Sequence, residues 1–316
     1  MRVVFLGTPE FAVPSLESLV AAPDITVPLV VTQPDRPSGR GRKLTAPAVK
    51  VMADSLEIPT LQPNTLRDDA AVAEIARAKP DLLIVVAYGE LLRRNILELT
   101  ALGCLNVHPS LLPSYRGAAP IPAAILNGDT VTGVSIMKLV RKLDAGPVLV
   151  QQEVDVKADD TTASLSSTLA RIAAEMLPSV VGAYAAGLIQ PAEQDESRAT
   201  YTREWTSADA RIGWTRSAEE IERLIRAANP WPVAWTSCRG ERLRVLSSTV
   251  ANSVSVALPP GDAMVLDGRV AVGTGRGWLT LETVQSAGKR PMPALDWWRG
   301  LRMDRLTFDF DTSGAS

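Results

Sequence analysis

Along the first half of the chain, segments that are apolar nearly throughout alternate with segments that carry apolar residues at helical spacing. The apolar segments are residues 2–7, 25–32, 81–87 and 103–107, and the helical ones are residues 13–22, 46–56, 70–78 and 91–99. Strands that are apolar on both faces and are joined by amphipathic helices are typical of a parallel sheet covered on both sides. The pattern therefore predicts an α/β domain with a mostly parallel sheet.

Three longer segments complete this predicted domain. Residues 131–139 and 147–156 are separated by a short break that contains glycine, so we expect them to close the sheet as an antiparallel pair. Residues 161–188 then place apolar side chains at helical spacing. Because proline cannot donate a helical hydrogen bond, we expect Pro178 to kink or split that helix.

The pattern changes after about residue 190. Residues 190–207 are polar and lack apolar periodicity, which indicates a linker. Beyond it, a helix over residues 218–227 precedes short strands that Gly, Asp and Pro separate. These strands are residues 233–238, 242–250, 263–266, 270–272 and 278–284. Such strands predict a small barrel or sandwich, and we therefore expect domains at 1–189 and 208–316.

Composition excludes several classes of protein. A chain of 316 residues with only two cysteines, Cys104 and Cys238, has neither a disulfide framework nor a Cys-rich metal site. Its start lacks the apolar core of a secretory signal and no apolar run is long enough to span a membrane, so we expect a cytoplasmic protein. The net charge of −2 argues against a polycation, although local basic patches can still bind nucleic acid.

The single histidine of the chain follows a predicted buried strand. His108 stands among Asn106, Ser110 and several prolines. Ligands of open α/β sheets bind at the carboxyl ends of strands, and imidazole changes charge near neutral pH, so this position suits acid–base chemistry or the stabilisation of negative charge. The alternative is a histidine that only hydrogen-bonds backbone. The polar and proline-rich surroundings favour the chemical role.

Other common catalytic motifs are missing. One histidine and two distant cysteines cannot assemble a typical zinc site, which disfavours metal-dependent hydrolysis but leaves a carboxylate-bound Mg²⁺ open. The first predicted strand leads into Gly7-Thr-Pro-Glu-Phe11, which matches neither the dinucleotide-binding fingerprint nor the P-loop. NAD(P)-dependent dehydrogenase and P-loop ATPase are therefore weak interpretations.

Two further clusters could carry function. Asp144, in Lys142-Leu-Asp144-Ala-Gly146, either shapes a tight turn or orients the imidazole of His108 and raises its pKa. Residues 34–43 (PDRPSGRGRK) place four cations in a Gly- and Pro-rich loop. That loop is either a solvated surface or an arm that closes on phosphates, for which the arginine fork is suited.

With these residues assembled, the chain resembles the methionyl-tRNA formyltransferase family along nearly its whole length. The resemblance rests on residues 5–12 (FLGTPEFA), 32–41 (TQPDRPSGRG), 85–89 (VVAYG), 106–108 (NVH), 110–113 (SLLP), 116–121 (RGAAPI), 143–146 (LDAG) and 225–232 (IRAANPWP). The Asn-x-His motif with a downstream Asp is shared by transferases that use 10-formyltetrahydrofolate, whereas the basic loop and Asn-Pro-Trp-Pro are more specific to the tRNA enzymes. The chain departs from that family's pattern at Arg93, Glu204 and Gly213.

The resemblance implies transfer of a formyl group from 10-formyltetrahydrofolate to the α-amino group of methionyl initiator tRNA, for translation initiation. It also implies a Rossmann-like catalytic domain and an OB-like barrel that contacts tRNA. We expect a monomer with no metal-binding site residues, no tightly bound cofactor and no covalent enzyme intermediate, and whether Mg²⁺ assists tRNA binding stays open. The implied catalytic residues are Asn106, His108 and Asp144. The implied folate contacts are Tyr88, Gly89, Ser110, Leu111, Leu112, Pro113 and Leu139, and the implied tRNA contacts are Arg36, Arg40, Arg42 and Lys43.

Elementary chemistry assigns roles to the three catalytic residues. The Asn106 amide and a protonated or donor-tautomer His108 would stabilise the negative charge that develops on the formyl oxygen. Asp144 would hold His108 and accept the proton of the attacking amine, directly or through water. Two alternatives stay open: a formyltransferase that acts on an amino-sugar nucleotide or glycinamide ribonucleotide, and a non-catalytic RNA-binding protein.

Overall fold

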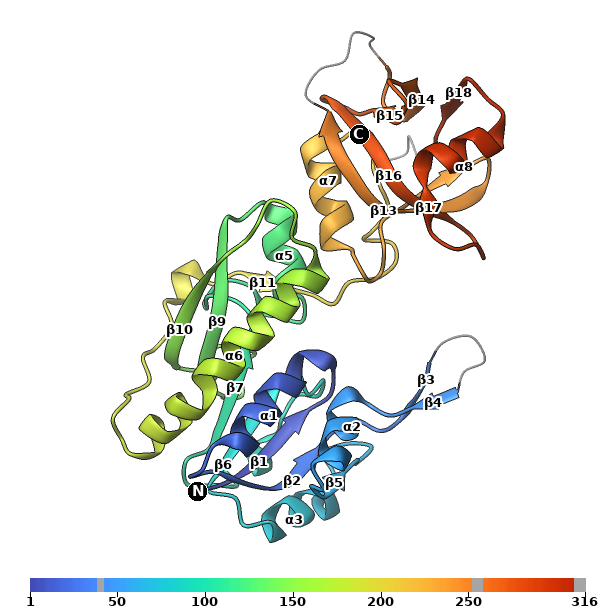
Figure 1. The fold of residues 1–316 in the computed structure, drawn as a ribbon. Coiled ribbons are helices and arrows are strands. Elements are labelled where there is room, and N and C mark those ends of the chain that lie inside the picture. Colours follow the sequence, from blue (N-terminus) through green and yellow to red (C-terminus); the bar gives the residue numbers. More distant parts are fainter. Residues whose placement is uncertain (39–42, 252–257, 310–316) are drawn as a thin grey trace. The chain divides into compact units, whose positions relative to one another are not determined.

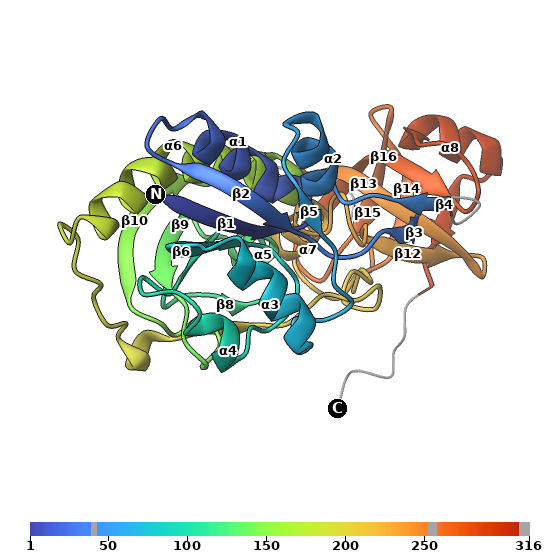
Figure 2. The ribbon, with the colours of Figure 1, turned by 90° about the horizontal axis from the view of Figure 1, so that it is seen from below.

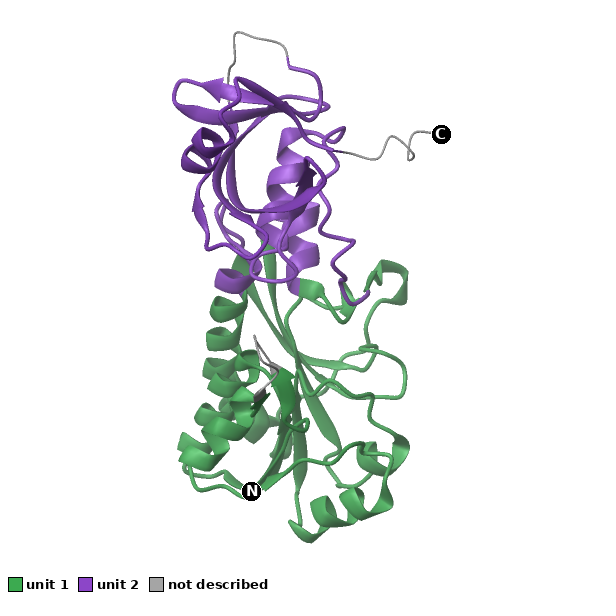
Figure 3. Ribbon diagram, turned by 90° about the vertical axis from the view of Figure 1, so that its right-hand side faces the viewer, with its two compact units in different colours: residues 1–120, 131–155, 166–202 green, residues 121–130, 156–165, 203–316 purple. Residues whose placement is uncertain are grey.

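The computed structural model describes residues 1–38, 43–251 and 258–309, which belong to two compact units (Figures 1 and 3). Unit 1 comprises residues 1–120, 131–155 and 166–202, and unit 2 comprises residues 121–130, 156–165 and 203–316. These units differ in extent from the predicted domains, because residues 190–202 pack within unit 1 and two earlier segments pack within unit 2. The functional division into catalytic domain, linker and tRNA-contacting domain stays a prediction.

Unit 1 is built on a seven-stranded sheet. Its strands are β1 (Arg2–Gly7), β2 (Thr26–Val31), β5 (Thr60–Leu61), β6 (Leu82–Val86), β7 (Cys104–His108), β9 (Val131–Lys138) and β10 (Val148–Asp155). They lie in the order β10-β9-β7-β6-β1-β2-β5. The five strands from β7 to β5 are parallel, and β9 and β10 are antiparallel to their neighbours. The predicted parallel sheet and its antiparallel closing pair are both confirmed.

Helices cover both faces of this sheet. They are α1 (Val13–Ala21), α2 (Ala48–Ser55), α3 (Asp69–Arg77), α4 (Arg94–Leu97) and α6 (Thr162–Ala185), with the short 3₁₀ helices η1 (Glu10–Ala12) and η2 (Glu196–Arg198). In Figure 2, α1, α2 and α6 lie on one face and α3 and α4 on the other. On the latter face, Val4, Leu6, Leu83 and Val85 of the central strands form a buried cluster with Ile75 of α3.

Two helix predictions differ from the structure. The helix expected over 91–99 spans only residues 94–97. A split of the long helix at Pro178 is contradicted, because Pro178 lies inside α6, while a kink there stays a prediction. Leu169, Leu177 and Val181 of α6 are fully buried. Burial of this apolar stripe offsets the hydrogen bond that a proline removes, so the helix continues through it.

Two small sheets extend unit 1. Strands β3 (Arg36–Ser38) and β4 (Lys43–Thr45) form an antiparallel pair after β2. Strands β8 (Arg116–Gly117) and β11 (Tyr201–Thr202) form a parallel pair and join the region after β7 to the end of the predicted linker. None of these four strands was predicted, because each has only two or three residues and none has an apolar pattern.

Unit 2 is a curled antiparallel sheet with helices. It contains α5 (Pro120–Asn127, from Ile121 on), α7 (Ala218–Ala227) and α8 (Ala294–Leu301), and the strands β12 (Trp235–Cys238), β13 (Glu241–Ala251), β14 (Asp262–Leu266), β15 (Arg269–Gly273), β16 (Trp278–Ser286), β17 (Met292–Pro293) and β18 (Arg305–Thr307). The strand order is β12-β13-β16-β15-β14-β18, with β17 on β16. A bridge between Ser237 of β12 and Asp309, just after β18, brings the two edges together.

Aromatic rings fill the core of unit 2. Phe308 stacks on Trp214 with 5.2 Å between ring centroids and on Trp297 with 6.2 Å. The Trp214 indole N–H donates to the Thr236 hydroxyl at 3.0 Å, so its one polar atom is satisfied. The predicted barrel-like β domain is confirmed as a curled half-barrel sheet. Among the described residues, no helix has the length and apolar character needed to cross a membrane.

Candidate active site

Strand β7 ends at the carboxyl edge of the unit 1 sheet with two buried polar side chains. Asn106 is 9% exposed and His108 is 5% exposed. Because side chains alternate between the faces of a strand, these two residues share one face with Cys104, which packs in the same buried cluster as Tyr88. The Asn106 amide has no protein partner among the described residues, so its donors are free to bind a ligand.

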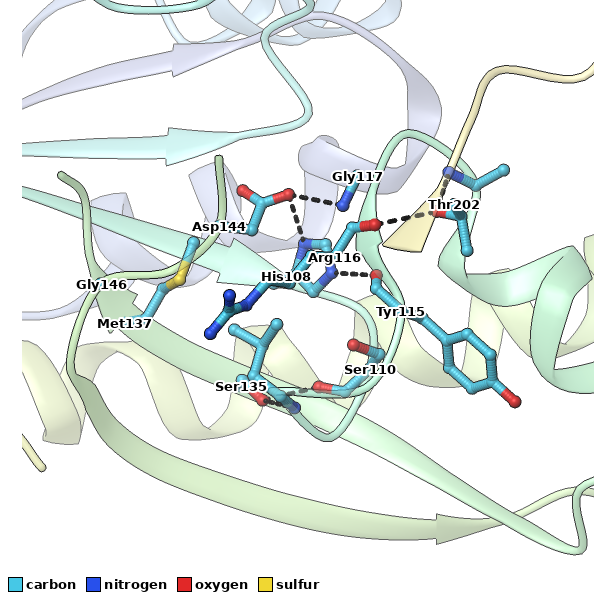
Figure 4. Close-up of polar contacts among 12 residues, drawn as sticks. His108, Ser110, Tyr115, Arg116, Gly117, Ser135, Met137, Asp144, Gly146 and Thr202 are labelled. Carbon is cyan, nitrogen blue, oxygen red and sulfur yellow. Dashed lines mark hydrogen bonds and ion pairs between the residues drawn. The ribbon is translucent and has the colours of Figure 1, made fainter. Parts of the chain in front are cut away.

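Hydrogen bonding determines where His108 carries its proton (Figure 4). The Nε2 atom lies 2.9 Å from the carbonyl oxygen of Tyr115. A carbonyl oxygen only accepts, so Nε2 carries the hydrogen and Nδ1 of the neutral ring keeps its lone pair. That Nδ1 faces Asp144, with 3.8 Å between Nδ1 and Oδ2. The Tyr115 carbonyl therefore orients the neutral ring, and the Asp144 carboxylate lies next to its Nδ1.

Burial also decides the charge of His108. Removal from water lowers its pKa below the usual value near 6.5, while the negative charge of Asp144 and the hydrogen bond to Tyr115 act in the opposite direction. Because the net pKa shift is downward, the neutral ring is the form present at neutral pH and Nδ1 is then an acceptor. The carboxylate is placed to stabilise the imidazolium that forms when Nδ1 takes up a proton.

Asp144 lies in the loop between β9 and β10. Its Oδ2 accepts the backbone N–H of Gly117 at 2.8 Å, and its backbone is left-handed, with φ of +46°. Gly117 has φ of +106°, and a Cβ at this position would lie 2.2 Å from the carbonyl oxygen of Thr202. Only glycine fits there, so this residue fixes the N–H that holds the carboxylate.

The loop that follows β7 is braced internally. The Ser110 hydroxyl donates to the carbonyl of Ser114 at 2.6 Å, and the Ser135 hydroxyl donates to the carbonyl of Ser110, also at 2.6 Å. The Gln151 amide donates to the carbonyl of Leu112 at 2.9 Å. Ser110 is fully buried, so its hydroxyl shapes the loop that carries the predicted folate contacts 110–113.

A fully buried arginine lies beside this loop. All five N–H groups of Arg116 have partners: two reach the Gln194 carbonyl oxygen, two reach the Glu196 carboxylate and one reaches the Tyr201 hydroxyl, at 2.8–3.2 Å. Glu196 also accepts from Lys142 at 2.7 Å. A buried guanidinium is tolerated only when it is paired and fully hydrogen-bonded, and Arg116 meets both conditions.

Sequence reasoning missed these partners. Gln194 and Glu196 lie in the polar segment 190–207, which has the composition of a linker and no apolar pattern. Their importance arises from contacts with residues about 50 to 80 positions earlier. No local signal marks such contacts. A single sequence could have indicated them only through Arg116, a charged residue within an otherwise apolar and glycine-containing stretch.

The predicted folate contacts lie in two groups. Tyr88 is in the buried cluster of β6 and β7, and Leu139 packs against that cluster. Gly89 lines a surface pocket of about 360 Å³ together with Gln33, Asn64, Thr65, Arg67 and Glu90. Residues 110–113 form the braced loop after β7. The structure thus places both groups at or next to the ends of β6, β7 and β9.

Two of the predicted tRNA contacts, Arg36 and Lys43, lie in the antiparallel pair of β3 and β4. Arg36 begins β3 and is exposed, and its guanidinium donates to the Gln33 side chain at 3.0 Å. Lys43 begins β4. Arg40 and Arg42 lie outside the described residues. The hairpin follows β2, whose carboxyl end is at the same edge of the sheet as that of β7.

Comparison with known proteins identifies the family. A family model described as formyl transferase matches residues 1–181, and one described as formyl transferase, C-terminal domain, matches residues 205–302. The chain belongs to the formyl transferase family. The region matched by the first model includes β7 and the residues Asn106, His108 and Asp144. The region matched by the second model covers most of unit 2.

Individual relatives agree with this assignment. A protein of Roseiflexus sp. (strain RS-1) named methionyl-tRNA formyltransferase is 50% identical over 303 residues, which cover 96% of this formyl transferase and 93% of that protein. Two solved structures share its fold. The N-formyltransferase from Helicobacter canadensis, in complex with folinic acid and dTDP-3-aminofucose, has a TM-score of 0.67 at 15% identity and covers 90% and 99% of the two chains. Methionyl-tRNA formyltransferase from Clostridium thermocellum has a TM-score of 0.58 at 15% identity and covers 80% and 95%.

Proposed function

We propose that this formyl transferase moves the formyl group of 10-formyltetrahydrofolate to the α-amino group of methionyl initiator tRNA. The observation that carries the proposal is the geometry at the end of β7. An oriented neutral imidazole lies beside a carboxylate there, and a free amide lies on the same face of the strand, in a chain 50% identical to a protein named methionyl-tRNA formyltransferase. Formyl transfer to an amine needs such groups, since charge develops on the formyl oxygen and the amine loses a proton.

The residues present fit a folate. The Tyr88 hydroxyl is buried and has no hydrogen-bond partner among the described residues, so a ligand with polar ring atoms would satisfy it. We infer that Tyr88, Gly89 and Leu139, together with the loop Ser110, Leu111, Leu112 and Pro113, hold 10-formyltetrahydrofolate. When bound, it supplies the formyl carbon. No tightly bound cofactor is required beyond this co-substrate.

The three catalytic residues then divide the work. The Asn106 amide donates to the formyl oxygen as negative charge develops on it. Nδ1 of His108 accepts the proton that the attacking amine releases, because Nε2 already donates to Tyr115. Asp144 stabilises the resulting imidazolium across the 3.8 Å separation. This division differs from the expectation that His108 donates to the formyl oxygen and Asp144 takes the proton.

Direct transfer without a covalent enzyme intermediate agrees with the protonation state of Cys104, the cysteine of β7. Burial raises the pKa of Cys104 to about 12, so it remains a protonated thiol at neutral pH. Cys104 therefore lacks the thiolate that a nucleophile requires. We also propose that the enzyme acts as a cytoplasmic monomer and needs no metal for the chemical step.

We infer that tRNA binds through both units. Arg36, Arg40, Arg42 and Lys43 of the hairpin region carry the charge for contacts with phosphates near the acceptor end. In unit 2, the guanidinium of Arg242 stacks on Trp235 at 4.2 Å and that of Arg211 at 5.4 Å, which makes a basic and aromatic surface of the kind that binds nucleic acid.

A two-substrate assay tests the function. Purified protein is mixed with 10-formyltetrahydrofolate and methionyl initiator tRNA, and formyl transfer is measured beside methionyl elongator tRNA and uncharged initiator tRNA. We expect transfer to the charged initiator alone. Folate binding without transfer to any tRNA would contradict the proposed acceptor and direct the search to an amino-sugar nucleotide or a ribonucleotide amine. If the protein neither bound the folate nor transferred a formyl group, the result would favour a non-catalytic RNA-binding protein.

A further inference from the structure

We propose that residues 192–202, which the sequence pattern presents as part of a linker, form a clamp that positions the catalytic loops. In this clamp Gln194 and Glu196 act as positioning residues for Asp144. The inference rests on the proposed function and deepens it, because it names which groups outside the catalytic set keep the carboxylate opposite His108.

Gln194 holds the Asp144 loop directly. Its side-chain N–H groups donate to the carbonyl oxygen of Asp144 at 2.9 Å and to that of Gly146 at 2.7 Å. Asp144 has a left-handed backbone, which these two hydrogen bonds help to maintain. The other end of the same amide, the carbonyl oxygen, accepts from Arg116. One side chain thus joins the loop after β9 to the loop after β7.

Glu196 holds both loops by charge. It pairs with Arg116 at 3.0 Å on one side and with Lys142, two residues before Asp144, at 2.7 Å on the other. Further along the clamp, Thr200 accepts the Tyr115 N–H at 2.8 Å with its hydroxyl and the Arg116 N–H at 2.9 Å with its carbonyl. The Tyr115 carbonyl that orients His108 is therefore fixed by the same segment.

The two groups that flank the imidazole are consequently set by one distant segment. The hydrogen bond from Nε2 depends on Tyr115, which has a left-handed backbone with φ of +60° and is held by Thr200. The charge opposite Nδ1 depends on Asp144, which is held by Gln194. A displacement of about 1 Å at a catalytic group can cost about 100-fold in rate, so loss of these contacts should lower turnover more than binding.

The test replaces the donors of Gln194 and keeps its shape. Gln194→Glu retains an acceptor for Arg116 but removes both donations to the loop. Gln190→Glu is the matched control, because Gln190 is an exposed glutamine two residues before the clamp, and its amide reaches the Gly187 carbonyl and no other group among the described residues. We expect Gln194→Glu to lower kcat about tenfold to 100-fold with KM for both substrates within about twofold, and Gln190→Glu to match the wild type.

A double-mutant cycle separates positioning from general damage. If Gln194 acts through Asp144, adding Gln194→Glu to Asp144→Asn should lower kcat less than about threefold further. Glu196→Gln, which keeps an acceptor for Arg116 and removes the charge, provides a second variant should Gln194→Glu fold poorly. It should lower kcat about threefold, again with little further loss in the Asp144→Asn background.

Each outcome bears on a different claim. A wild type that transfers no formyl group would overturn the proposed function and this inference with it. An active wild type with unchanged kcat in Gln194→Glu would overturn the clamp alone. The clamp would also be overturned if Gln194→Glu lowered kcat by the same factor in the Asp144→Asn background as in the wild type. It would be overturned as well if Gln194→Glu raised KM and left kcat unchanged.

Discussion

Two regions at the carboxyl edge of the unit 1 sheet are built in opposite ways. The loops around His108 are held by hydrogen bonds from residues 192–202, with a fully buried guanidinium beside them. The β3–β4 hairpin is held by three residue pairs, and Leu44 is 65% exposed. Chemistry requires fixed positions, whereas contacts with phosphate depend on charge and tolerate adjustment. Substitutions in the first region should lower kcat, and those in the hairpin should raise KM for tRNA.

The largest effect is expected at His108. His108→Ala removes the proposed proton acceptor and should lower kcat by about 10²–10⁴ with little change in KM for either substrate. Steady-state kinetics on both substrates measures this, and circular dichroism with a thermal melt checks that the variant is folded. A folded variant with a near-normal rate would show that His108 takes no part in the mechanism. The proposed contrast between the two regions would then lose its main support.

Asp144→Asn should have the next largest effect, a loss of about 10–100-fold in kcat, since the imidazolium loses its charge partner. The same change alters the pH dependence. The Asp144 charge raises the pKa of His108 against the lowering effect of burial, so its removal lowers that pKa further. The acid limb of the kcat–pH profile should therefore move to lower pH. An unshifted limb would mean that the carboxylate does not tune His108.

The difference between the regions also explains what the sequence could predict. The apolar strands, the antiparallel closing pair and helix 218–227 follow from local periodicity, and all are confirmed. His108 could be singled out because it is the lone histidine after a buried strand. The clamp could not be predicted, because Gln194 and Glu196 act through contacts that only the folded chain brings together. Their composition resembles that of a solvated linker.

Substitution of the hairpin arginines should affect binding rather than turnover. Arg36→Ala combined with Arg40→Ala and Arg42→Ala should raise KM for methionyl-tRNA about tenfold and leave kcat within about twofold. The slope of log KM against log salt should fall by about 1 for each phosphate that the variant no longer neutralises. Arg171→Ala, at an exposed arginine of α6, is the control. A variant whose folate KM alone changed would assign the hairpin to the other substrate.

The smallest effect concerns stability in acid. Hydrogen bonds from Arg116 and Lys142 lower the pKa of Glu196 to about 2, from an ordinary value near 4.5. Because the folded chain favours the carboxylate, this stabilisation is complete above about pH 4.5 and is lost as the pH falls toward 2. The Tm of the wild type should therefore decline more steeply below pH 5 than that of Glu196→Gln.

Glu193→Gln is the matched control for this measurement, since Glu193 is an exposed carboxylate of the same segment with no ion pair among the described residues. It should follow the wild-type curve. Equal acid slopes for the wild type and Glu196→Gln would show that the pair with Arg116 adds nothing to the folded state. The clamp would then hold the Asp144 loop through Gln194 alone. In that case hydrogen bonds, and not charge, would make the loops around His108 more fixed than the β3–β4 hairpin.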